Sequence, residues 1–352
     1  MSTTVEYALR VLAGIAGGWL VITTVSGAIR SFVLPRNESV RLNAFVFSGV
    51  RALFDFSARR ANTYARRDRI LAHYAPVALV ALPIGWLALV GVGYSAIYWA
   101  LGVEDFTKSY ELSGSSLLTL GTTSESGFAV NVFSYSEATI GLLLLTLLIS
   151  YLPTLYQAFS RRELVVAQVE LRAGTPATAA GLLAWLGHDG SFENDDAQWL
   201  AWEQWLVEID ESHTSLPVLA FFRSPQGGRS WVTTAGLILD AANLLFSALD
   251  VPRTRQVELT FKAGVLALNR VYRFFDHTAE TEPAELRTPL EQAAATPDRA
   301  DFAATWQVLR EAGLPLRASE EAAWQHYTER RLRYAPAQEF LNALLMTPPL
   351  AK

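Results

Sequence analysis

The sequence predicts an all-α membrane protein with three transmembrane helices and one re-entrant loop, followed by an all-α cytoplasmic domain. Three observations support this class. Three apolar stretches are each long enough to cross a bilayer, which takes about 20 residues of α-helix. A short polar run, residues 119–127, lies between the second and the third stretch. After residue 162 charged residues return, and apolar residues recur at helical spacing with almost no strand alternation.

The composition is that of a membrane protein with a substantial soluble part. Of the 352 residues, 51% are hydrophobic, and the net charge is -5. Cysteine is absent, which excludes disulfides, thiolate nucleophiles and cysteine-based metal sites. No two of the five histidines stand at metal-ligand spacing, and the sequence contains no nucleophile elbow or phosphate loop. We therefore expect that the protein is not an enzyme and that it has no cofactor and no nucleic-acid partner.

Residues 1–30 are predicted to form the first transmembrane helix. Residues 7–28 are apolar apart from Arg10, which lies near one end and can extend its charge to the membrane surface. Gly14 and Gly18 have the spacing that lets membrane helices approach closely. No basic region precedes this stretch, so we interpret it as a retained segment and not as a signal peptide.

Residues 31–72 are predicted to form a basic loop with an amphipathic helix. Apolar residues between positions 40 and 54 recur at helical spacing, so this helix would lie on the inner leaflet beside anionic lipids or pack on its own protein. The positive-inside rule places the loop in the cytoplasm. Between the first and the second apolar stretch there are nine arginines and three acids: Arg30, Arg36, Arg41, Arg51, Arg59, Arg60, Arg66, Arg67 and Arg69 against Glu38, Asp55 and Asp68.

Residues 73–162 are predicted to form a third part, which holds the second stretch at residues 76–101, the polar run and the third stretch. The connection between the two stretches is acidic, with Glu104, Asp105, Glu111 and Glu125 against Lys108, so it faces outward. The N-terminus is then outside and the C-terminus inside, in a plasma membrane of the bacterial type.

The third stretch is predicted to begin near Ser134, because Ser134 and Glu137 have capping-box spacing. It ends at residue 159, before Arg161 and Arg162, which belong in water or among lipid headgroups. Gly141 offers a hinge. Pro153 removes a helical hydrogen bond near the cytoplasmic end, which predicts a gate there or a kink used only for packing.

The polar run has the chemistry of a cation filter. Residues 109–118 predict a short helix that descends partway into the membrane and ends at Thr119, Leu120 and Gly121. Oxygens on an axis shared by several subunits can replace the water around a cation, and a helix C-terminus favours cations. Glu125 would raise the local cation concentration. The predicted filter residues are Thr122, Thr123, Ser124, Glu125 and Ser126.

Two stretches around a short helix and a filter with paired threonines resemble the tetrameric cation channels of the potassium channel superfamily, over roughly residues 76–162. The resemblance implies a homotetramer that conducts K+ or Na+. Potassium channels carry Thr-Val-Gly-Tyr-Gly-Asp, and aligning Thr122 with that threonine puts Ser124 and Ser126 on the two glycines. Serine tolerates positive φ poorly, so a full ladder of potassium sites is not expected.

The run from Thr119 to Glu125 is more similar to the Thr-Leu-Thr-Thr-Ile-Gly-Glu filter of cyclic-nucleotide-gated channels, which conduct several cations. By that resemblance Glu125 forms an acidic ring at the outer mouth. We therefore expect weak selectivity between K+ and Na+. A K+-selective channel with an atypical filter is the first alternative. A non-conducting, channel-like membrane receptor or scaffold is the second.

Residues 163–352 are predicted to form the helical cytoplasmic domain. Residues 231–249 are long and apolar, but Asp240 and Asn243 near the middle would be costly in lipid, so we expect a buried helix of this domain. A separate helix is expected at residues 164–173. No nucleotide-binding glycine pattern is present, and the gating signal is left open.

Overall fold

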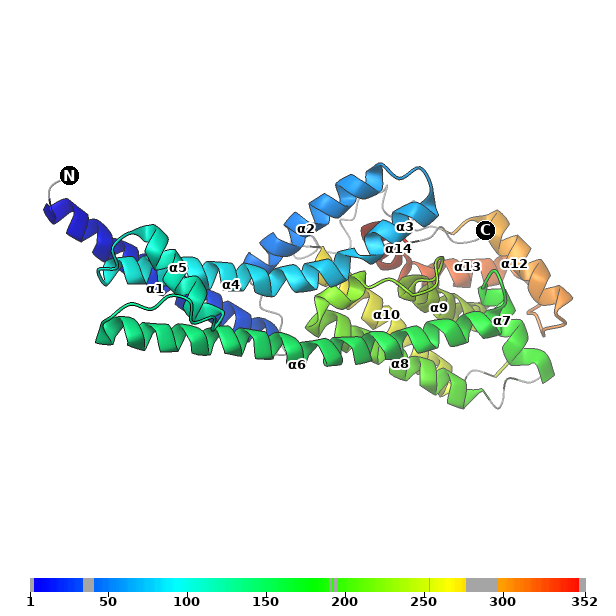
Figure 1. Cartoon of the computed structure of the whole chain (residues 1–352). Coiled ribbons are helices and arrows are strands. Elements are labelled where there is room, and N and C mark those ends of the chain that lie inside the picture. The colour runs from blue at the N-terminus through cyan, green and yellow to red at the C-terminus, as the bar shows by residue number, and fades with distance from the viewer. Residues whose placement is uncertain are drawn as a thin grey trace. The chain divides into compact units, whose positions relative to one another are not determined.

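The computed structural model describes residues 3–33, 41–189, 192, 195–252, 254–276 and 297–347 (Figure 1). Among these residues all regular structure is helical, apart from a single antiparallel bridge between Leu249 and Leu316. The chain divides into two compact units, Met1–Tyr156 and Gln157–Lys352. We call these the N-terminal unit and the C-terminal unit. Arg36 and Glu38 of the predicted basic loop lie outside the described residues.

Three helices are long and apolar enough to cross a membrane: Thr4–Ser31, Tyr64–Ala100 and Phe128–Ala173. This confirms the predicted all-α class with three candidate spans. The N-terminal unit contains α1 (Thr3–Val33), α2 (Arg41–Arg59), α3 (Tyr64–Ala72), α4 (Tyr74–Ala100), α5 (Phe106–Leu117) and the first part of α6 (Phe128–Ala173).

Small residues bring α1 and α4 into close contact. A Cβ atom added to Gly17 would lie 2.4 Å from the carbonyl oxygen of Gly93, and one added to Gly14 would lie 2.7 Å from the Cβ of Ala100. A Cβ atom added to Gly18 would have no atom within 4 Å. The predicted pair of Gly14 and Gly18 is therefore wrong in its second member, because Gly17 is the residue that faces α4. Close backbone approach replaces a bulky apolar interface here.

The helix α6 is longer at both ends than the sequence suggested. It begins at Phe128, directly after Gly127, and continues for 46 residues to Ala173. Ser134 and Glu137 thus lie inside the helix, so the predicted capping box is wrong. The separate helix expected at residues 164–173 is the last part of α6, since Arg161 and Arg162 do not interrupt it.

The C-terminal unit has a large aromatic core. Trp199, Trp202 and Trp231 are among its fully buried side chains. Its further elements are α7 (Ala179–Leu186), η1 (Gly187–Asp189), α8 (Asp196–Ser215), η2 (Pro217–Phe221), α9 (Trp231–Ser247), α10 (Arg255–Phe275), α12 (Arg299–Glu311), α13 (Glu320–Arg331) and α14 (Ala335–Leu345).

The apolar helix α9 is buried in this unit, as predicted, and its polar residues have partners. Asn243 donates from Nδ2 to the carbonyl oxygen of Tyr327 at 2.9 Å. Asp240 accepts from the hydroxyls of Tyr327 and Tyr334 and forms an ion pair with Arg331. Buried polar groups are tolerated when they are hydrogen-bonded, which explains why this helix can carry them.

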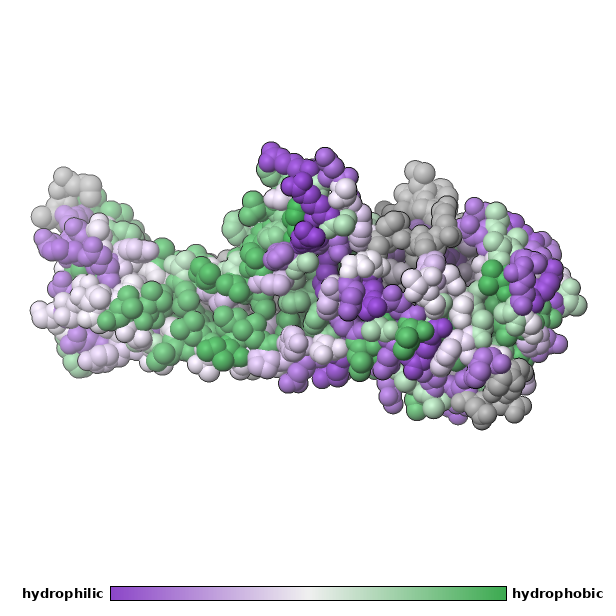
Figure 2. Space-filling model, turned by 45° about the vertical axis from the view of Figure 1, so that its right-hand side comes forward, coloured by the Kyte–Doolittle hydropathy of each residue, from purple (hydrophilic) through white to green (hydrophobic). Residues whose placement is uncertain are grey.

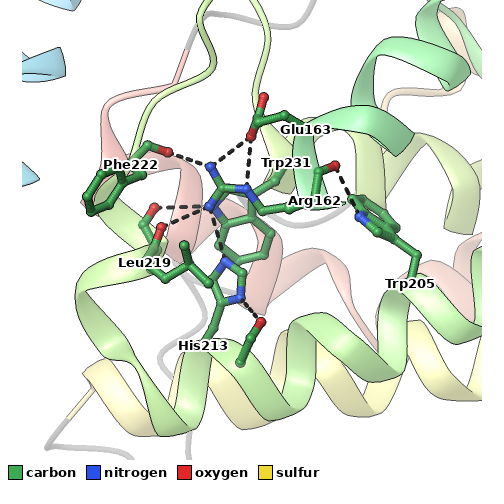
Figure 3. A network of polar contacts seen from close by, with 9 residues as sticks. Arg162, Glu163, Trp205, His213, Leu219, Phe222 and Trp231 are labelled. Atoms are coloured by element: carbon green, nitrogen blue, oxygen red, sulfur yellow. Dashed lines mark hydrogen bonds and ion pairs between the residues drawn. The ribbon is translucent and has the colours of Figure 1, made fainter. Parts of the chain in front are cut away.

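Arg162 fixes the end of α6 in the C-terminal unit (Figure 3). Its side chain is only 3% exposed, and its guanidinium donates to the carbonyl oxygens of Leu219 at 2.8 Å and Phe222 at 2.6 Å. Glu163 forms an ion pair with it at 2.7 Å. The expectation that Arg162 lies in water or among headgroups is therefore wrong, whereas Arg161 is exposed and pairs with Glu208.

His213 completes this network as a neutral side chain. Nη1 of Arg162 lies 3.3 Å from Nε2 of His213, and Nδ1 of His213 lies 3.1 Å from the carbonyl oxygen of Ile209. A guanidinium only donates, so Nε2 must accept and Nδ1 must carry the proton. Burial and the neighbouring Arg162 charge hold the pKa of His213 well below its usual range.

This arrangement predicts that acid destabilises the C-terminal unit. The unfolded histidine binds a proton below about pH 6.5 and the folded one does not. Stability should thus be unaffected by His213 above that pH and fall by up to about 1.4 kcal/mol per pH unit below it. The measurement is the thermal unfolding midpoint between about pH 8 and pH 5. His213→Gln should lose less on acidification than the wild type, and the exposed His188→Gln should match the wild type. Parallel curves for all three proteins would contradict the assignment.

Candidate functional site

The polar segment, residues 118–127, connects the end of α5 to the start of α6. Thr122, Ser124, Glu125 and Ser126 are exposed in the single chain, and Thr123 is half-buried. The predicted filter residues therefore lie together on one connection. Exposed apolar residues flank them at both ends, with Leu118 and Leu120 on one side and Phe128 on the other.

The segment leaves α5 through a tight, hydrogen-bonded turn. The N–H of Leu120 donates to the carbonyl oxygen of Ser115 at 2.8 Å, and the N–H of Thr119 donates to that of Ser116 at 3.0 Å. These two bonds form a Schellman motif, which satisfies carbonyls at a helix end. Thr119 takes the left-handed position with φ +54, where glycine is usual, and Gly121 follows with φ +67. The three residues predicted at the helix end, Thr119, Leu120 and Gly121, form this turn.

Ser115 of α5 holds the backbone of the polar segment at Thr123. The Oγ of Ser115 accepts a hydrogen bond from the N–H of Thr123 at 3.1 Å. The same hydroxyl donates to the carbonyl oxygen of Thr123 at 3.3 Å. Ser115 is itself buried. One side chain thus fixes both main-chain polar groups of a residue in the middle of the segment. The Thr123 carbonyl is directed toward α5 of its own chain.

Behind the segment, a buried carboxyl group joins three helices. Glu137 of α6 is 0% exposed. Its Oε2 accepts from the hydroxyl of Tyr98 in α4 at 2.7 Å, and its Oε1 accepts from the hydroxyl of Ser113 in α5. Among the described residues it has no ion pair with a basic side chain. Hydroxyl donors alone therefore stabilise this carboxyl group in the interior.

A set of further hydroxyls surrounds this carboxyl group. The Oγ of Ser134 in α6 lies 3.0 Å from the Oγ of Ser116 and 3.3 Å from the hydroxyl oxygen of Tyr98. Ser136 lies 2.8 Å from the hydroxyl of Tyr94. Polar contacts thus hold the start of α6 against both α4 and α5. Since the polar segment joins α5 to α6, these contacts set the separation of its two ends.

Gly141 lets α6 pass close to the end of α5. A Cβ atom at this position would lie 2.2 Å from the carbonyl oxygen of Leu117, so no larger residue fits without movement. This is a packing reason for the glycine, and its predicted role as a hinge stays a prediction. Pro153 lies inside the continuous α6, and its predicted role in a gate also stays a prediction.

Sequence reasoning missed Glu137, Tyr98, Ser113 and Ser115 as site residues. Two signals were available for them. A single acid at the start of an apolar helix indicates a specific partner, because an unpaired charge is costly at membrane depth. In addition, Ser109, Ser113 and Ser116 recur at helical spacing, which places their hydroxyls on one face of α5. Because Ser134 and Glu137 have capping-box spacing, a capping role seemed to explain Glu137 without a partner in another helix.

The described residues contain no group of three or more histidine, aspartate or glutamate side chains that could hold a metal ion. Comparison with protein-family models, curated proteins and solved structures finds no match. The function of the protein is therefore inferred from the polar segment and the contacts that support it.

The Glu137 contacts predict a graded loss of stability on substitution. Glu137→Ala removes one acceptor from each of the Tyr98 and Ser113 hydroxyls, which keep Ser134 and the Gly91 carbonyl oxygen as their other partners, and it should lower the stability of the N-terminal unit by about 1–3 kcal/mol. Glu137→Gln keeps one carbonyl acceptor and should lose less. The measurement is the thermal unfolding midpoint of the full chain in detergent. The exposed Glu111→Ala is the control and should match the wild type. Equal midpoints for the two Glu137 variants and the control would show that the carboxyl group does not hold these helices.

Proposed function

We propose that this protein is one subunit of a homotetrameric channel for monovalent cations in a plasma membrane, weakly selective between K+ and Na+. The polar segment forms the filter, α6 lines the cavity below it, and the C-terminal unit lies in the cytoplasm. No soluble cofactor takes part, because the permeating ions are the only ligands that the function requires.

The observation that carries this proposal is the polar segment itself. It is a non-helical, hydroxyl-rich connection between two helices of a unit with three candidate spans, and all its side chains except that of Thr123 are exposed in the single chain. Irregular backbone is tolerated at membrane depth only where protein or water surrounds it. A ring of four copies around a water-filled axis meets that condition. The helix end at Leu117 and the exposed Glu125 both favour cations there.

The backbone of the segment supports weak selectivity. Within it, positive φ values occur at Thr119, Gly121 and Gly127 and not at Ser124 or Ser126. The two serines therefore do not adopt the conformations that glycine permits at the corresponding positions of a potassium filter. The Thr123 carbonyl is also engaged by Ser115 of its own chain. Fewer carbonyls are then available on the axis, and hydroxyls with water would complete the ion's shell.

The deciding experiment is the reversal potential of the full-length protein in planar bilayers. With K+ on one side and Na+ on the other, we expect a reversal near zero, and with a KCl gradient we expect a shift toward the cation equilibrium value. A reversal near the K+ equilibrium value under the first condition would replace weak selectivity with K+ selectivity. Absence of any current or ion flux would favour a receptor or scaffold with the same architecture.

Glu125→Gln tests the position of the acidic ring. Four fewer negative charges at the mouth should lower the single-channel cation conductance by roughly two- to tenfold at low ionic strength. The difference should shrink at high salt, because the charges are then screened. The control is Glu258→Gln, which removes an exposed charge from the C-terminal unit. Equal conductance of the Glu125 variant and the wild type at low salt would remove Glu125 from the mouth.

A further inference from the structure

The hairpin formed by α2 and α3 has an apolar face that none of the described residues of its own unit covers. One face of α2 packs on α4, where Val46 and Phe47 join the core and the ring of Phe54 lies 6.0 Å from that of Tyr74. On the remaining face, Phe45 is 77% exposed, Leu53 64% and Phe56 55%. Because α4 covers only one face of α2, the exposed apolar face can contact apolar groups from outside the unit.

A cluster of arginines continues from this face. Arg59 ends α2, Arg60 follows it directly, and three more arginines lie in α3, so the basic cluster consists of Arg59, Arg60, Arg66, Arg67 and Arg69, all exposed. None of the five forms an ion pair among the described residues, and the nearby Asp55 is engaged by Arg51 at 2.9 Å. The guanidinium of Arg60 lies 3.9 Å from the ring centroid of Phe56, which joins the charged and apolar parts.

The connectivity of this hairpin is that of a segment at a membrane boundary. It joins α1 to α4, two of the helices that are apolar and long enough to span. Only His73 separates the end of α3 from the start of α4. Figure 2 shows hydrophilic residues gathered at the tip of the projecting hairpin and hydrophobic residues along its flank. This is the distribution of an interfacial segment, with aromatic and aliphatic side chains toward the acyl region and cations at headgroup level.

We infer that the α2–α3 hairpin is a binding site for anionic phospholipids. The basic cluster binds the phosphate of the headgroup, and Phe45, Leu53 and Phe56 lie against the upper part of the acyl chains. A second copy of the chain is a poorer occupant, since a two-fold contact would bring the two arginine clusters together. The inference goes beyond ion conduction and does not depend on it.

Native mass spectrometry of the full-length protein in detergent tests the site. The protein is titrated separately with phosphatidylglycerol and with phosphatidylcholine of the same acyl composition. We expect tighter binding of phosphatidylglycerol. Each basic residue near an anionic surface adds about fivefold in affinity, so Arg66→Gln, Arg67→Gln and Arg69→Gln combined should weaken it by at least about tenfold. Glycerol phosphate added in excess should not displace the lipid, because the acyl contacts are part of the site.

The matched control removes the same number of exposed arginines from the C-terminal unit: Arg255→Gln, Arg273→Gln and Arg310→Gln. It should bind phosphatidylglycerol like the wild type. A second variant, Phe45→Ser with Leu53→Ser, should weaken both lipids alike and keep the preference between them. The tryptophan emission spectrum confirms that each variant is folded.

Three results would overturn the inference. Equal affinity of the wild type for the two lipids would show that the arginines do not recognise a headgroup. Equal losses in the hairpin variant and the control would show that only net charge matters. Unchanged lipid binding with dissociation of the oligomer in the hairpin variants would show that this face joins copies of the chain.

Discussion

The buried carboxyl group of Glu137 imposes the main constraint on the N-terminal unit. A carboxyl group inside an apolar helix bundle needs donors, and here the donors come from two other helices, Tyr98 in α4 and Ser113 in α5. Three helices must therefore keep their relative positions for the group to stay satisfied. Gly141 adds a steric condition one turn further along α6, because it leaves room only for the carbonyl oxygen of Leu117. Polar and steric requirements thus fix the same pair of helices, α5 and α6.

That pair carries the polar segment, and the consequence is a short connection held at defined points. Its start is set by the turn at Thr119, its middle by the two contacts of Ser115 with Thr123, and its end by the contacts of α6. Hydroxyl groups make most of these contacts. They are weaker individually than ion pairs, but they place no net positive charge behind a segment that is proposed to attract cations. An arginine in place of Tyr98 or Ser113 would satisfy Glu137 and oppose the cation.

The parts of the fold that depend on local pattern could be predicted, and the parts that depend on distant partners could not. Hydropathy was sufficient for the three candidate spans, and Asp240 and Asn243 identified α9 as a buried helix of the other unit. The start of α6 was misplaced because Ser134 and Glu137 match a local capping pattern, while their actual partners lie in α4 and α5. The burial of Arg162 depends on the carbonyl oxygens of Leu219 and Phe222, which lie 57 and 60 residues further along the chain. A local sequence pattern cannot predict such distant partners. The polar segment was recognised from its composition, but the role of Ser115 requires the fold.

The continuity of α6 bears on how a signal could reach the proposed filter. The boundary between the units falls at residue 157, inside this helix, and Pro153 lies one turn before it. Arg162, about one turn beyond the boundary, binds three residues of the C-terminal unit and cannot move away from them without leaving a buried charge unpaired. A rearrangement of the C-terminal unit would therefore move the end of α6 with it. Because proline removes one helical hydrogen bond, bending costs least near Pro153, and the helix on the filter side keeps its contacts through Gly141 and Glu137. On the proposed function, this makes the short stretch around Pro153 the place where movement of one unit would be converted into a change of pore width.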